Sequence, residues 1–144
     1  MRSGVKVTIK KNNLDKIGKN VGSAIRDGIN DVGDDLVRAS SGATPFDKGT
    51  LSQSWNKNIS VSRLQAIAEV SYSVHNRGFN YAIKMHEGSY NLGPGSRSKP
   101  GGQGMSGKRY SVGPKFLERP LLGEQQAYKD HIKEMIQKSI KGLS

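Results

Sequence analysis

The chain has no cysteine, which excludes disulfide bonds and thiolate chemistry and fits a reducing compartment. Apolar residues are also scarce, at 33% of the chain, and no apolar run approaches the ~20 residues that a membrane span needs. The first residues, MRSGVKVTIKKNN, alternate apolar and polar side chains and lack the apolar stretch of a signal peptide. We therefore expect no membrane partner.

Acidic residues are few as well. Twelve acids stand against 23 lysines and arginines, which leaves a net charge of +11. Such an excess favours an anionic partner, whether a nucleic acid, an acidic protein surface or a membrane face. A length of 144 residues is typical of one domain, so we expect a single domain over residues 1–144.

Residues with catalytic or metal-binding spacing are not found. The three histidines are His75, His86 and His131, and no two of them lie one helical turn apart as a zinc-binding pair would. Residues 102–107 match GxGxxG, but a nucleotide-binding loop needs a hydrophobic strand before it and a helix after it, and SRSKPG and RYSVGP stand there instead. The sequence predicts a protein that is not an enzyme and has no metal site and no cofactor.

The periodicity of the apolar residues predicts an α+β fold, in which a mostly antiparallel, twisted sheet is packed by a long N-terminal helix and a C-terminal helix. Residues 5–9 alternate like a strand with one wet face, and Asn12 or Asn13 can cap the helix that follows. The apolar stripe of that helix is Leu14, Ile17, Val21, Ile25, Ile29, Val32 and Leu36. Four glycines within it predict either a kinked helix or the close approach of another backbone, such as that of a neighbouring subunit.

The long helix should end near residues 40–42, where Gly42 can take a left-handed cap conformation. Residues 47–49 read as a turn, and residues 55–61 and 66–74 alternate like two strands joined by a hairpin at residues 62–65. We expect Trp55, the only tryptophan, to be largely buried between this sheet and the long helix. Residues 81–85 are either a third short strand or a helical turn, and residues 121–143 suit an amphipathic helix with a lysine-rich outer face.

Residues 88–113 differ in composition from the rest of the chain. They hold eight glycines and two prolines, together with Arg97, Lys99, Lys108 and Arg109, and no acid. Few apolar groups are available to offset the entropy of ordering this segment, so we interpret it as a mobile basic loop. The four cations are either a solvated surface, an assembly element that meets acidic groups on another protein, or a contact to DNA. We favour the assembly element.

A series of short motifs runs along the chain in a defined order. It starts with TPFDKGTLSQSW at residues 44–55, continues with a tyrosine–alanine pair and a glutamate–glycine pair, and closes with a proline, phenylalanine, leucine and proline cluster. The motif residues are Thr44, Pro45, Asp47, Gly49, Leu51, Trp55, Tyr81, Glu87, Gly88, Pro114, Phe116, Leu117 and Pro120. This ordered series, over roughly residues 10 to 140, resembles the tail-completion and head–tail joining proteins of long-tailed bacteriophages, which include neck, tail-terminator-like and minor capsid proteins.

The resemblance implies a structural protein that completes or terminates the phage tail and joins it to the head. It implies a ring of identical subunits, commonly six, with tail-tube and head-connector proteins as partners and passing DNA as a further contact. Such a protein would belong to the virion, at the head–tail junction, after assembly in the host cytoplasm. The alternative function is sequence-nonspecific nucleic-acid binding, driven by counterion release from phosphates.

Overall fold

A computed structural model of the chain describes residues 5–12, 19–45, 50–62, 65–76 and 79–141. Three antiparallel strands form its main sheet in the order β1-β3-β2, with bounds β1 (Val5–Asn12), β2 (Trp55–Val61) and β3 (Gln65–Tyr72). The alternation read from the sequence is confirmed in β3, where every second residue from Ala66 to Tyr72 is fully buried. The α+β class is therefore confirmed.

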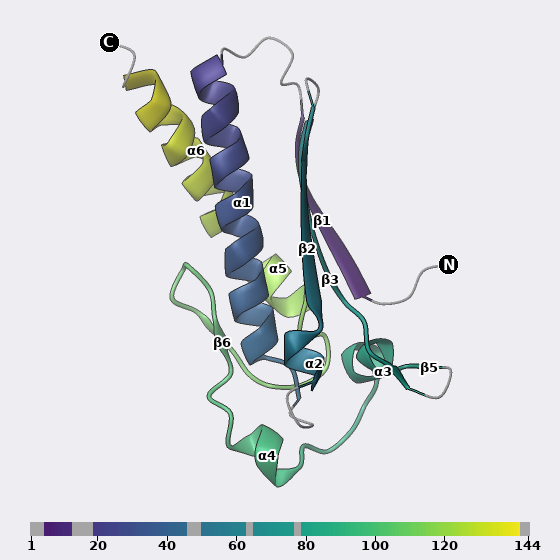
Figure 1. Cartoon of the computed structure of the whole chain (residues 1–144). Coiled ribbons are helices and arrows are strands. Elements are labelled where there is room, and N and C mark those ends of the chain that lie inside the picture. The colour runs from purple at the N-terminus through teal and green to yellow at the C-terminus, as the bar shows by residue number, and fades with distance from the viewer. Residues whose placement is uncertain (1–4, 13–18, 46–49, 63–64, 77–78, 142–144) are drawn as a thin grey trace.

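Two long helices lie on one side of this sheet and run beside each other (Figure 1): α1 (Lys19–Gly42) and α6 (Gln125–Lys141). The predicted stripe of α1 is confirmed from Val21 onward, since Ile25, Ile29, Val32 and Leu36 are all fully buried. Its first two members lie outside the described residues. The helix ends at Gly42, where the sequence placed its end, but Gly42 does not take the expected left-handed conformation. Instead Gly42 lies against the backbone of Gly102, where an added Cβ would come within 2.6 Å of the Gly102 Cα.

Two of the glycines in α1 are explained by close approach within the same chain. A Cβ atom on Gly28 would lie 3.3 Å from Cγ1 of Ile132 in α6, and one on Gly33 would lie 3.1 Å from Cδ of Lys57 in β2. Gly22 differs, because a Cβ there would meet nothing within 4 Å. The neighbours that approach these two helical glycines are thus α6 and β2 of the same chain.

Short elements fill the end of the molecule where α1 stops (Figure 1). They are α2 (Thr50–Gln53), β4 (His75–Asn76), β5 (Phe79–Asn80), α3 (Tyr81–Glu87), α4 (Pro94–Arg97), β6 (Gly102–Gln103), β7 (Arg109–Tyr110) and α5 (Glu118–Gly123). Of the two alternatives for residues 81–85, the helical turn is correct. None of the helices in the described ranges is long and apolar enough to cross a membrane.

The expected burial of Trp55 is wrong, since 45% of its surface is exposed. Trp55 faces α1, because it stands opposite the buried Tyr72 in the β2–β3 register and directly opposed residues share a face. However, β2 is an edge strand, and α1 covers the central strand β3 more fully than it covers β2. The cover over Trp55 is therefore incomplete.

The interpretation of residues 88–113 as a loop with little to bury is also wrong. The segment forms α4 and the β6–β7 hairpin, and Gly102, Gly104 and Tyr110 are buried. The sequence argument counted apolar side chains, whereas this segment packs mainly through glycine backbone and through polar contacts. Most of these contacts are made by the β6–β7 hairpin.

Candidate functional site

The motif residues that follow one another along the chain lie close together around the end of α1. Leu51, Ala82, Phe116 and Leu117 are fully buried in one cluster with Tyr72. The Phe116 ring packs edge-on against Tyr72 at 5.2 Å between centroids and against His86 at 4.9 Å. Phe116 and Leu117 of the closing motif thus anchor the chain on the core. Asp47 and Gly49 lie outside the described residues.

Backbone hydrogen bonds tie these motifs to each other. The Gly113 amide donates to the Ala43 carbonyl at 3.1 Å, and the Lys115 amide donates to the His86 carbonyl at 2.7 Å. Thr44 is fully buried and its hydroxyl donates to the Ser41 carbonyl at 2.7 Å. The segment after α1 and the segment before α5 are thereby held side by side.

The glutamate–glycine pair closes helix α3 onto the same cluster. The Glu118 amide donates to Nε2 of His86 at 3.3 Å, and Nδ1 of His86 lies 2.5 Å from a carboxylate oxygen of Glu87. Lys115 also bonds Glu87 at 2.5 Å, and these contacts hold the pKa of Glu87 below its usual value, Lys115 first and His86 second. The Gly88 amide donates to the Lys84 carbonyl at 2.8 Å and ends the helix.

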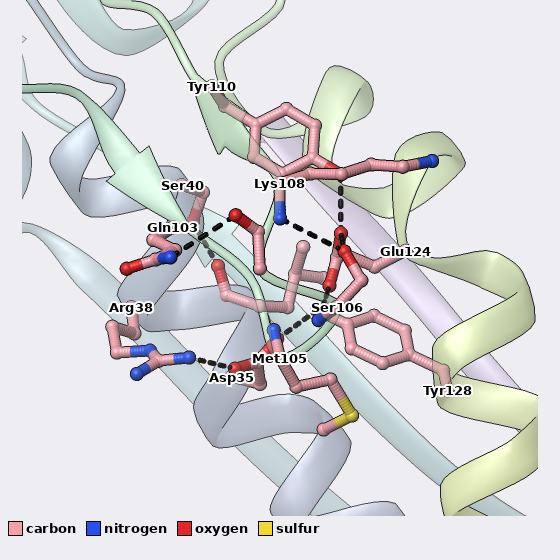
Figure 2. A network of polar contacts seen from close by, with 12 residues as sticks. Asp35, Arg38, Ser40, Gln103, Met105, Ser106, Lys108, Tyr110, Glu124 and Tyr128 are labelled. Atoms are coloured by element: carbon pink, nitrogen blue, oxygen red, sulfur yellow. Dashed lines mark hydrogen bonds and ion pairs between the residues drawn. The ribbon is translucent and has the colours of Figure 1, made fainter.

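A second set of contacts holds the β6–β7 hairpin against α1 and the α5–α6 junction (Figure 2). Gly102 lies directly on the backbone of α1, where an added Cβ would come within 1.7 Å of the Ala39 carbonyl oxygen. Gly107 has φ +92 and closes the turn, which the Gly107 amide spans by donating to the Gly104 carbonyl at 3.0 Å. The GxGxxG pattern therefore serves close packing and a tight turn.

Glu124, the residue between α5 and α6, is fully buried and receives the hairpin. Its Oε1 accepts from the Ser106 amide at 2.8 Å, and its Oε2 accepts from the Ser106 hydroxyl at 2.5 Å and from the Tyr110 hydroxyl at 2.6 Å. Burial by itself would raise the pKa of Glu124, but the hydrogen bonds from Ser106 and Tyr110 outweigh it and lower the pKa below its usual value.

Asp35, in the C-terminal half of α1, is the second buried carboxylate of the hairpin site. Its Oδ2 accepts from the Met105 amide and from the Tyr128 hydroxyl, both at 3.0 Å, and its Oδ1 accepts from Arg38 at 2.7 Å. Desolvation and the neighbouring Asp35 raise the pKa of Tyr128. Two successive amides of the hairpin, at residues 105 and 106, are thus bound by two carboxylates from distant parts of the chain.

Asp35 and Glu124 were missed by the sequence analysis. The only local signal is that Asp35 stands between Val32 and Ala39 at helical spacing, and so on the buried side of α1. A buried carboxylate at such a position needs donors, and nothing in the sequence indicates that they come from the glycine-rich segment. Both carboxylates have their hydrogen bonds made within the chain, and together they position the hairpin.

The four cations of the glycine-rich segment do not form one group. Lys99 is partly buried and donates to the Thr44 carbonyl at 2.6 Å and to the Ser41 carbonyl at 3.4 Å, at the end of α1, and burial lowers its pKa. Lys108 is exposed and donates to the Gly123 carbonyl at 3.3 Å. Arg97 and Arg109 are exposed. Lys99 is therefore a structural residue, and Arg97 and Arg109 are the two cations most available to a partner.

Across the described ranges, no group of three or more histidine, aspartate or glutamate side chains is arranged to hold a metal ion. Comparison with protein-family models, with curated proteins and with solved structures found no match to this chain.

Proposed function

We propose that this chain is a structural protein of a long-tailed bacteriophage, a ring subunit that completes or terminates the tail and joins it to the head. The observation that supports it is the convergence of the motif residues. Buried residues at positions 43–44, 51, 82, 86 and 116–117, far apart in the sequence, lie in or against one cluster at the end of α1. The buried members of the ordered series thus pack together, and a shared scaffold explains their order better than separate local turns do.

The hairpin gives this scaffold a fixed basic surface. Gln103 and Arg109 stand opposite each other on its exposed side, while Gly102 and Tyr110 on the other side are buried. Because Asp35 and Glu124 hold the hairpin in place, Arg109 is presented at a defined position. A surface that is already ordered loses less conformational entropy on docking, which suits repeated assembly of identical subunits. Arg97 and Arg109 are the proposed contacts to acidic groups of a tail-tube or connector protein.

The test is to mix the purified protein with phage tail tubes and to image them by negative stain. Wild type is expected to form a ring-shaped cap at one end of the tubes. The double variant Arg97→Ser with Arg109→Ser is expected to cap fewer tubes. The double variant Lys129→Ser with Lys133→Ser removes the same charge from exposed positions of α6 and serves as the matched control. Bare tubes with the wild-type protein would count against the proposal.

Nucleic-acid binding is the alternative, and the same variants separate it from assembly. A DNA-binding protein with these exposed cations should bind duplex DNA without any phage partner, and its affinity should fall steeply as salt is raised. Tight, salt-sensitive DNA binding that is weakened by both double variants, with no capping of tubes, would favour the alternative.

A further inference from the structure

The outer flank of strand β2 is only half covered. Its residues that face α1, Trp55, Lys57, Ile59 and Val61, are all partly or largely exposed, whereas their β3 partners Tyr72, Val70, Ala68 and Ala66 are fully buried. Figure 1 shows the reason, since α1 runs along the sheet and β2 forms the rim on the viewer's side of β1 and β3. A row of partly covered side chains, three of them apolar and with the only tryptophan at one end, thus borders the free edge of the sheet.

The same four residues direct their backbone groups toward this free edge. The Ser62 amide donates to the Gln65 carbonyl at 2.8 Å, which makes residues 62 and 65 a hydrogen-bonded pair of the hairpin. Such pairs alternate along an antiparallel ladder, and the register from Val61 to Trp55 has no interruption. Residues 61, 59, 57 and 55 therefore point their N–H and C=O groups away from β3. In the part of the chain that the structure describes, no strand pairs with that edge.

The helix beside β2 brings negative charge to this flank. Lys57 donates to Asn30 at 2.8 Å and forms an ion pair with Asp34, so this face of α1 borders β2. The Asp34 side chain remains 59% exposed despite that ion pair. Asp27 lies three residues before Asn30, on the same face of the helix, and is exposed.

The opposite edge of the sheet is complementary in charge and length. Strand β1, VKVTIKKN, contains three lysines and no acid. Lys11 stands opposite Ala66 and so on the side of the sheet that faces α1, whereas Lys6 and Lys10 alternate to the other side. It pairs with residues 65–72 of β3, and β2 pairs with residues 66–72 of the same strand, so the two edges have nearly the same span. Both are antiparallel to β3 and therefore run in the same direction.

We propose that the β2 flank is a strand-addition site for strand β1 of a second copy of this chain. The incoming strand would lie parallel to β2, bond its outward amides, cover Trp55 and Ile59, and bring Lys11 to the side of the sheet that faces α1, where Asp27 is exposed. Each copy then offers one β1 edge and one β2 edge, so the contact is head-to-tail and the copies close into a ring or continue as a filament. The inference rests on the proposed function only in the expectation that they close.

Trp55 gives a direct assay, because it is the only tryptophan and it lies in the proposed contact. Its fluorescence emission is expected to shift to shorter wavelength with rising protein concentration, in parallel with the mass measured by light scattering after gel filtration. Lys57→Pro removes one outward amide, and Lys57→Ala loses the same ion pair but keeps the amide. We expect Lys57→Pro to move the midpoint of association to a concentration at least about tenfold higher than that of Lys57→Ala.

A second pair of variants covers the case in which Lys57→Pro does not fold by circular dichroism. Asp27→Lys reverses an exposed charge on the flank and is expected to weaken association, more so at low salt. Asp130→Lys makes the same change at an exposed position of α6 and should leave association unchanged. A wild-type protein that stays monomeric at every concentration, with constant emission, overturns the inference, as does equal association of both variants in each pair.

Failure of this inference can be told apart from failure of the proposed function. If the wild type associates through the β2 flank but caps no tail tubes, strand addition stands and the proposed function is wrong. If the Lys57→Pro and Lys57→Ala variants cap tail tubes equally well and also associate alike, the proposed function stands and strand addition is overturned.

Discussion

Replacing Gly102 with alanine tests whether the hairpin is packed as tightly on α1 as the structure shows. An ideal Cβ at this position would lie 1.7 Å from the Ala39 carbonyl oxygen and 2.6 Å from the carbonyl carbon. Nonbonded carbon atoms at an optimal separation are about 3.5–4.0 Å apart, so one of the two backbones has to move by well over 1 Å. Ala39 belongs to a long, packed helix, and we therefore expect the hairpin to move.

The free-energy cost follows from what the hairpin would lose. Displacing it removes the Met105 amide from Asp35 and the Ser106 amide from Glu124. Hydrogen bonds to charged groups contribute about 1.5–3 kcal/mol each, so losing both amounts to about 3–6 kcal/mol. Water entering the opened site offsets part of that, and we expect Gly102→Ala to lower the free energy of unfolding by about 3 kcal/mol. In a chain of this size that corresponds to a Tm lower by about 6–12 °C.

The assay is urea denaturation followed by far-UV circular dichroism, with Gly93→Ala as the matched control. A Cβ on Gly93 would meet nothing within 4 Å, and its φ of −77 suits any residue, so we expect its free energy of unfolding to stay within about 0.5 kcal/mol of wild type. Equal stability of Gly102→Ala and Gly93→Ala would refute the close packing of the hairpin on α1.

Three further predictions follow from the buried contacts. The pKa of Glu124 is lower in the folded chain than its ordinary value of 4.5, so its contribution to stability is fully present above that pH and is lost as the pH falls through the lower, folded-state value. Urea titrations from pH 7 to pH 3 should therefore show a smaller loss of unfolding free energy for Glu124→Gln than for wild type. Phe116→Ala should lower the free energy of unfolding by about 3–5 kcal/mol, whereas Trp55→Ala should lower it by only about 1–2 kcal/mol because Trp55 is half-exposed. Equal losses in denaturation curves would contradict this difference in burial. Lys99→Ala should destabilise the chain by about 1–2 kcal/mol because the carbonyls at the end of α1 lose their donor, and the control Arg97→Ala should stay within about 0.5 kcal/mol of wild type. The reverse order of stability in thermal melts would contradict the role of Lys99 as a donor to these carbonyls.

The sequence by itself determined the elements whose signals are local. The stripe from Val21 to Leu36 predicted α1, and the alternation on either side of residues 62–65 predicted the β2–β3 hairpin. The end of α1 was placed correctly at residues 40–42, although Gly42 does not take the left-handed cap conformation that suggested it. Each of these predictions depends on the spacing of side chains or on the backbone preference of one residue, and such signals can be read without knowing any distant partner. The resemblance to phage tail-completion proteins also depends only on the order of the motifs, and it stays a prediction.

The tertiary structure decided what depends on partners that are distant in the sequence. Trp55 has a strand period that fits a buried position, but its exposure depends on how far α1 extends over an edge strand. The glycines of residues 101–107 look like a flexible tract by composition. However, Gly102 packs on Ala39, which lies in α1 and about sixty residues earlier in the sequence. Lys99 reads as a free cation until the end of α1 is placed beside it. In each case the sequence supplied the chemical group, and only the fold supplied the neighbour that determines whether the group is buried, packed or free.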